Sequence, residues 1–163
     1  MMIQSITGLA NILKLNDRLF INALENITNE QAKERLSEHN NPVNWLANHI
    51  LWGRYEMLDL LGKAREKNPY KELFENFKPY DEDTVLNQIE YIKEEWSKVA
   101  LLISDALETV TEERLAEEAK SVTPIGIPTI FGSLSFFVWH ESYHLGQVAL
   151  LKKHYTAEPM KFF

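Results

Sequence analysis

The amino-acid sequence predicts an all-α protein, a single antiparallel four-helix bundle over residues 1–163. Four long stretches place apolar residues three and four positions apart, which is the spacing of a helix face buried in a core. No stretch shows the alternation of apolar and polar residues that is typical of a half-buried strand. The four stretches lie near residues 3–27, 42–61, 83–110 and 129–154. Amphipathic helices of this number and length indicate a four-helix bundle.

The first two helices have recognisable ends. Asn16 is the one polar member of the apolar face of 3–27, and Thr28 to Gln31 form a capping box that predicts a short further turn of helix. Pro42 suits the first turn of the second helix, and Gly62 suits its end. The apolar face of the first helix comprises Ile6, Leu9, Leu13, Phe20, Ala23 and Ile27.

The third helix has the strongest helical pattern, and either Asp81 or Asp83 is its expected N-cap. Thr129 is the expected cap of the fourth helix. Residues 63–81 form the longest irregular segment, whose aromatic residues we expect to lie against the bundle. These are Tyr70, Phe74, Phe77 and Tyr80. The face of the third helix comprises Val85, Ile89, Ile92, Trp96, Val99, Ile103, Ala106 and Val110.

Composition and charge exclude several functions. The formal net charge of −7 argues against nucleic acid or an anionic membrane as a partner, because both require a basic surface. No apolar stretch is long enough for a membrane span and the N-terminus lacks the features of a signal peptide, so we expect a cytoplasmic protein. The absence of cysteine excludes thiolate metal sites and leaves His, Asp and Glu for metal binding or acid–base chemistry.

Three histidines are candidate metal ligands. His140 and His144 fall on one face of the fourth helix, in the apolar segment SLSFFVWHESYHLGQVALLKK, so both imidazoles can reach one ion. His49 lies on or beside the apolar face of the second helix, whereas His39 and His154 lie in polar surroundings. His49 taken alone is better explained as a hydrogen-bonded core residue. The three together favour a metal site, because bundle cores build such sites from facing helices.

A second interpretation of the same segment is a peptidase motif. Residues 140–144 read H-E-x-x-H, in which two histidines bind zinc and the glutamate acts as general base. That mechanism requires a third ligand downstream, and Glu158, beyond the end of the predicted helix, is a poor candidate. We therefore keep the peptidase as a remote alternative and expect Glu141 to be a carboxylate near the ligands or at the surface.

The placement of these motifs resembles the DinB/YfiT-like superfamily. The matching pieces are His49 within WLANHI and the segment HESYHLGQ, together with the order of the helices and the loops between them. The resemblance implies a four-helix bundle in which one histidine of the second helix and the H-x-x-x-H pair of the fourth bind a divalent metal. It also implies a homodimer. Relatives include thiol-dependent S-transferases, isomerases and metal-dependent hydrolases. The family name refers to DNA damage, but the negative charge gives no support for DNA binding.

From these observations we expect a metal-dependent enzyme that acts on a small molecule, either a thiol S-transferase using a low-molecular-weight thiol or a hydrolase. Zinc or nickel is the first expectation for the metal, with iron or manganese as alternatives, since imidazole suits several divalent ions. Two other interpretations stay open: a metal-dependent binding or stress-response module without turnover, and a bundle in which the histidines are structural.

Further residues are weaker candidates for the site. Glu56 lies two turns after His49 and could orient a ligand or act as a base, or it could be a surface carboxylate. Gln147 could form a hydrogen bond near the ion or simply pack. The aromatic residues expected to wall the site are Trp45, Trp52, Trp139 and Tyr143.

Overall fold

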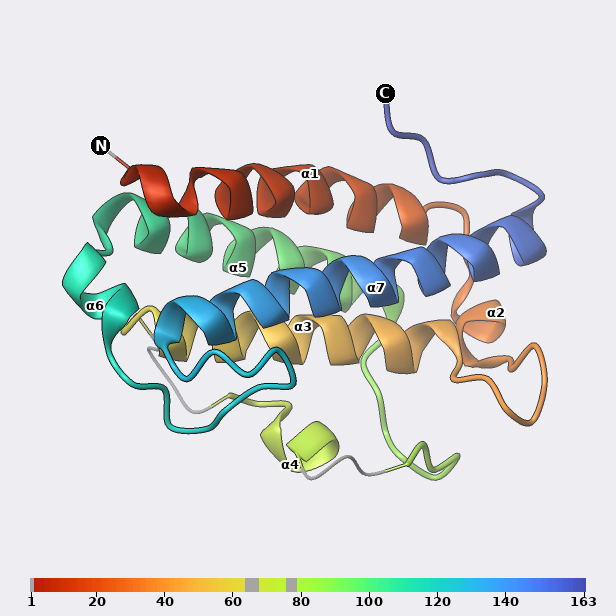
Figure 1. Ribbon diagram of the computed structural model, residues 1–163. Coiled ribbons are helices and arrows are strands. Elements are labelled where there is room, and N and C mark those ends of the chain that lie inside the picture. Colours follow the sequence, from red (N-terminus) through yellow and green to blue (C-terminus); the bar gives the residue numbers. More distant parts are fainter. Residues whose placement is uncertain (1, 64–67, 76–78) are drawn as a thin grey trace.

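Four long helices form the bundle (Figure 1). The computed structural model describes residues 2–63, 68–75 and 79–163. Within this part of the chain no strand forms, apart from one isolated bridge between Glu118 and Thr129, so the predicted all-α bundle is confirmed. The long helices are α1 (Thr7–Leu24), α3 (Val43–Leu60), α5 (Ile89–Thr109) and α7 (Ile130–Thr156). Short helices are η1 (Gln4–Ile6), α2 (Asn29–Lys33), α4 (Lys71–Phe74) and α6 (Glu112–Ala116).

The helices run in an up-down-down-up order. Figure 1 shows α1 and α7 running in one direction and α3 and α5 in the other. Two hydrogen bonds between α1 and α7 agree with a parallel arrangement of these helices. Asn16 of α1 bonds to Glu141 of α7, and Asn26, just after α1, bonds to Glu158, just after α7. The histidine-bearing helices α3 and α7 are therefore antiparallel neighbours, whereas α1 and α7 run parallel.

The third long helix begins later than predicted. It starts at Ile89 rather than near residue 83, and Val85, which the apolar pattern placed in the core, is 91% exposed. Neither Asp81 nor Asp83 caps the helix, whose N-cap is Gln88. The Asp81 side chain accepts a hydrogen bond from the Asp83 N–H at 3.0 Å, a local turn that competes with helix formation. Asn29 of α2 instead accepts a hydrogen bond from the Ile89 N–H at 3.0 Å. The predicted face is buried from Ile89 onward.

Other predicted helix ends are confirmed. The Thr28 capping box is present, and the Thr129 side chain accepts a hydrogen bond from the Gly132 N–H at the start of α7. Gly62 follows α3 with a φ of +71°, a left-handed conformation that favours glycine and ends the helix. The first helix is shorter than predicted at both ends, because its first turn is the 3-10 helix η1 and it stops at Leu24, before Asn26 with a φ of +62°. The last helix continues to Thr156.

The core is filled by apolar side chains from all four long helices, and the segment after α3 adds aromatic rings to it. Tyr70 and Phe74 are buried and Tyr80 is half-buried, as predicted for this segment, whereas Phe77 lies outside the described residues. The described helices include none with the length and apolar character that crossing a membrane requires. The placement of Phe74 matters for the site, because it covers one side of His49.

Candidate metal centre

Three histidines from two helices converge between α3 and α7. His49 lies in the middle of α3, and His140 and His144 lie one turn apart on α7. The Nε2 atom of His140 is 3.1 Å from Nε2 of His49 and 3.0 Å from Nε2 of His144. The possible ligand atoms of the three rings all lie within 4.8 Å of one another. The structure therefore brings together the three histidines selected from the sequence.

The spacing of the three nitrogens fits a bound cation. Two nitrogens that each lie about 2.0–2.1 Å from a tetrahedral zinc ion are about 3.3–3.4 Å apart, which is close to the separations found. Without a cation, at most one of the two contacts to His140 can be a linear N–H···N hydrogen bond, because a single ring nitrogen either donates or accepts. The donor set of three imidazoles therefore suits a divalent ion and does not form a complete hydrogen-bond network.

All three rings are held in the neutral state that a metal requires. Burial, followed by the charges of His140 and His144, lowers the pKa of His49 to about 3. Burial and the charge of His144 lower the pKa of His140 to about 4. Burial also lowers the pKa of His144, although its hydrogen bond to Gln147 acts in the opposite direction. A neutral imidazole offers the lone pair through which histidine binds metals.

Gln147 fixes the orientation of one ring. The Nδ1 of His144 lies 2.7 Å from Oε1 of Gln147, so Nδ1–H donates to the amide oxygen and Nε2 keeps its lone pair. The amide Nε2 of Gln147 donates in turn to the Tyr143 hydroxyl at 3.4 Å. Of the two roles considered for Gln147, hydrogen bonding beside the cluster is therefore the one observed.

Aromatic rings enclose His49. Trp45 and Trp52 stack on its imidazole at centroid distances of 4.8 and 5.2 Å, one from the preceding turn of α3 and one from the following turn. Phe74 of α4 lies edge-on to the same ring at 5.0 Å. The Nδ1 atom of His49 is buried and has no hydrogen-bond partner. The His49 ring is thus held by packing and by the contact of its Nε2 with His140.

The α7 side of the cluster is more open. Tyr143 lies edge-on to His144 at 5.0 Å, and Trp139 stacks on Tyr143 at 5.6 Å. Trp139 is 58% exposed and Tyr143 is 52% exposed. Of the four predicted wall residues, Trp45, Trp52 and Tyr143 contact histidine rings, whereas Trp139 extends the wall toward the surface.

The two candidate glutamates lie outside the cluster. Glu56 accepts a hydrogen bond from Asn68 Nδ2 at 2.8 Å and so ties the segment before α4 to α3. Glu141 is 2% exposed and is bound to Arg54 in the core, so of its two expected places the surface is wrong. The geometry does not support the peptidase interpretation, which requires this glutamate to act at the metal.

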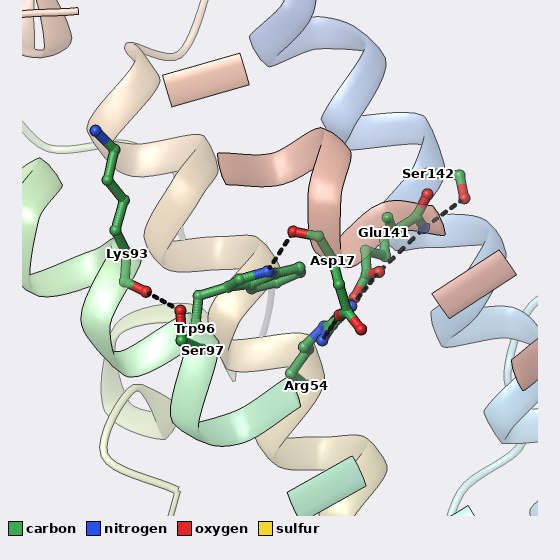
Figure 2. A network of polar contacts seen from close by, with 8 residues as sticks. Asp17, Arg54, Lys93, Trp96, Ser97, Glu141 and Ser142 are labelled. Atoms are coloured by element: carbon green, nitrogen blue, oxygen red, sulfur yellow. Dashed lines mark hydrogen bonds and ion pairs between the residues drawn. The ribbon is translucent and has the colours of Figure 1, made fainter. Parts of the chain in front are cut away.

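Sequence reasoning missed the polar network around Glu141, shown in Figure 2. Arg54 bonds to Glu141 and Asp17, and Asn16 also donates to Glu141. Two signals were present in the sequence: Asn16 interrupts the apolar face of the first helix, and Arg54 stands four residues after Ile50 and three before Met57, on the apolar face of the second helix. Either residue could have indicated a buried polar or charged partner on another helix.

Comparisons with known proteins agree with this architecture. Among solved structures, a conserved protein from Enterococcus faecalis is similar, with a TM-score of 0.70 and 14% identity, covering 97% of this chain and 99% of that one. At this identity the similarity concerns the fold. No curated protein sequence matches the chain. The sequence profile of the DinB superfamily matches residues 12–148, which is most of the chain. The chain therefore belongs to the DinB superfamily.

Proposed function

We propose that His49, His140 and His144 bind one divalent metal ion and that the protein is a metal-dependent enzyme acting on a small molecule. The observation that carries the proposal is the convergence of three neutral imidazole nitrogens at separations of 3.0 and 3.1 Å. Zinc and nickel are the preferred ions, with iron and manganese as alternatives, because an all-imidazole set does not select strongly among them.

The number of ligands supports catalysis over a purely structural role. Structural zinc sites are closed by four protein ligands, whereas catalytic sites use three and keep one position for water or substrate. In the described part of the chain, the cluster contains three such residues. When bound, a divalent ion supplies the Lewis acidity that deprotonates a water molecule or a thiol near neutral pH.

The surrounding residues have separate tasks in this proposal. Trp45 and Trp52 hold the His49 ring by stacking and exclude water from that side. Gln147 holds His144 in the tautomer that binds through Nε2. Tyr143 and Trp139 offer partly exposed aromatic surface beside the open side of the cluster, where the apolar part of a substrate can pack.

We propose thiol S-transfer or hydrolysis as the reaction class. Both use a nucleophile that is deprotonated at a Lewis-acid site, and both occur among the relatives that the family resemblance implies. The two glutamates considered, Glu56 and Glu141, are bonded to Asn68 and Arg54 and do not belong to the histidine cluster. Activation of the nucleophile is therefore assigned to the ion held by the histidines.

Metal content is the first test. Protein purified without a metal-affinity tag is analysed for elements and titrated with Co²⁺, and we expect one ion per chain. His49→Ala is expected to abolish binding, whereas His154→Ala, which changes an exposed histidine outside the cluster, is expected to leave it intact. Equal metal content in the wild type and in the triple His→Ala variant would contradict the site.

Turnover is the second test. Metal-loaded protein is incubated with electrophilic substrates together with glutathione, bacillithiol or mycothiol, and separately with esters and amides. A thiol-dependent rate that is lost in His49→Ala supports S-transfer, and a thiol-independent rate lost in the same variant supports hydrolysis. Metal binding without turnover on either panel would overturn the enzyme assignment in favour of a binding module.

A further inference from the structure

A buried ion pair joins the two helices that carry the histidines. Arg54 of α3 donates two hydrogen bonds to Glu141 of α7, from Nε to Oε2 at 2.8 Å and from Nη2 to Oε1 at 2.9 Å. Arg54 is 0% exposed and Glu141 is 2% exposed. Figure 2 shows the guanidinium reaching toward Glu141, with Asp17 and Trp96 close by. Two parallel hydrogen bonds fix both the distance and the relative orientation of the groups.

The other two long helices complete the surroundings of Arg54. Asp17 of α1 accepts a hydrogen bond from Nη1 at 2.5 Å, and the Trp96 ring of α5 lies 3.5 Å from Cζ. Asn16 of α1 donates to Glu141 Oε1 at 3.0 Å. Burial alone would lower the pKa of Arg54, but the charges of Glu141 and Asp17 raise it above its ordinary value. The guanidinium is therefore charged, and the network connects all four long helices.

The apolar pattern of α7 does not by itself decide which side of the helix faces the core. From Ile130 to Leu151, Glu141 is the one Asp, Glu, Lys or Arg residue. Large apolar residues occur on the buried side, such as Leu145, and also on the exposed side, such as Leu150 at 62% exposure. A helix that is apolar all round can bury several of its faces at similar free energy. A buried polar group with one matching partner can select among such arrangements.

The rotation of α7 determines where the histidines point. Neighbouring residues on an α-helix differ by about 100° around the axis, so a side chain at 141 held in the core directs the one at 140 to the side. Gly53, the residue before Arg54, lies against His140: a Cβ atom at Gly53 would be 3.9 Å from His140 Nδ1. The ion pair and the histidine contact are thus adjacent on both helices.

We propose that Arg54 and Glu141 are positioning residues of the metal site: their ion pair fixes the rotation of α7 against α3 so that His140 and His144 face His49. The inference rests on the proposed metal site and adds to it the device that orients two of its three ligands. It also gives the glutamate of the H-E-x-x-H segment a role that requires no contact with the ion.

The test replaces the pair by apolar residues of similar size, Arg54→Met with Glu141→Leu, because such replacements of buried ion pairs commonly preserve the fold. We expect this double variant to unfold near the wild-type denaturant concentration. We expect it to bind Co²⁺ at least about tenfold more weakly, as for other groups that orient metal ligands. The visible absorption bands of bound Co²⁺ should change as well, because they report coordination geometry. Wild-type affinity and bands in the folded double variant would overturn the proposal.

Leu24→Ala is the matched control for general destabilisation. Leu24 is fully buried in α1, which carries none of the three histidines, so its loss destabilises the fold and should leave Co²⁺ affinity and bands unchanged. An equal loss of Co²⁺ affinity in Leu24→Ala would show that the double variant binds Co²⁺ weakly only because its fold is destabilised. That result would overturn the assignment.

A conservative variant decides the question if the double variant does not fold. Glu141→Gln keeps one oxygen that accepts from Arg54, and we expect weaker Co²⁺ binding with altered bands in a folded protein. Wild-type Co²⁺ affinity and absorption bands in Glu141→Gln would overturn the proposal.

If the wild type itself binds no Co²⁺, Zn²⁺ or Ni²⁺, the proposed function fails. Crystal structures of wild type and Glu141→Gln then decide, because an unchanged His49–His140 Nε2 separation would refute positioning.

Discussion

Two polar clusters connect α3 to α7, and they differ in how completely their polar atoms are hydrogen-bonded. The histidine cluster contains three neutral rings, is half-buried, and places Nε2 of His49 and of His144 3.1 and 3.0 Å from one His140 nitrogen, which can form only one linear hydrogen bond. The cluster around Arg54 is buried, pairs opposite charges, and bonds the guanidinium through Nε, Nη1 and Nη2. Buried polar groups are nearly always hydrogen-bonded. The satisfied cluster therefore stabilises the fold, whereas the crowded Nε2 atoms of the other cluster are those that the proposed ion would bind.

The H-E-x-x-H segment is divided between these clusters. His140 and His144 belong to the first and Glu141 to the second, although all three lie within five residues of α7. One helix turn is enough to direct neighbouring side chains into different environments. A sequence motif therefore acquires its chemistry from the face that each residue occupies.

The largest expected effect is the loss of the Arg54 partner. Glu141→Ala leaves a buried guanidinium without its main counter-ion, and we expect the free energy of unfolding to fall by about 3 to 5 kcal/mol. Glu117→Ala is the control, because that glutamate forms an exposed ion pair with Arg114, whose loss should cost under about 1 kcal/mol. Urea unfolding measures both. Similar losses in the two variants would show that the buried cluster does not support the fold as the comparison requires.

The histidine cluster should contribute to stability only through its ligand. At a free Zn²⁺ concentration of about 100 times Kd, binding to the folded state alone raises the free energy of unfolding by about 2.7 kcal/mol. We expect this gain in the wild type, its reversal by a chelator, and its absence in His49→Ala. Denaturant titrations with and without Zn²⁺ measure it. An equal gain in His49→Ala would place the bound ion elsewhere on the protein.

Gln147 tests whether orientation of a ligand ring matters. Removing the acceptor of the His144 Nδ1–H in Gln147→Ala is expected to weaken metal binding by about 10–100-fold, or about 1.4 to 2.7 kcal/mol. Gln147→Glu retains an acceptor and should keep most of the affinity. The exposed Gln88 gives the control, Gln88→Ala, with unchanged affinity. Competition with a coloured chelator measures the constants, and wild-type affinity in Gln147→Ala would remove this residue from the site.

Much of the fold could be predicted because periodicity reports burial directly. The face of α5 from Ile89 onward is buried as predicted. The error at its start arose because Val85 continues the spacing by coincidence, while a local turn at Asp81 and a cap from Asn29 decide where the helix begins. Such a cap comes from a residue distant in sequence, so a local pattern does not reveal it.

The three histidines of the candidate site could be predicted from the sequence, whereas the residues that surround them could not all be predicted. Three histidines on the faces of two helices required only helix geometry, whereas the enclosure of His49 by Phe74 depends on how the segment after α3 folds back. The partner of Glu141 could not be chosen from spacing, because any basic residue on another helix was eligible. The single domain, the homodimer and the cytoplasmic location stay predictions.

The smallest expected effect sharpens the comparison most. In metal-free protein, His49→Phe keeps an aromatic ring between Trp45 and Trp52 and removes both the partnerless Nδ1 and the crowded Nε2. Since the pKa of His49 is lowered to about 3, the change removes no charge at neutral pH. Replacing an unsatisfied polar group by an apolar one of similar shape is near neutral or stabilising, so we expect the free energy of unfolding to stay the same or rise by up to about 1 kcal/mol. Metal binding should be lost in the same variant. Urea unfolding in the presence of a chelator measures the stability. A decrease of more than about 1 kcal/mol in the free energy of unfolding would mean that the polar atoms of His49 stabilise the metal-free fold. The histidine cluster would then resemble the Arg54 cluster in this respect.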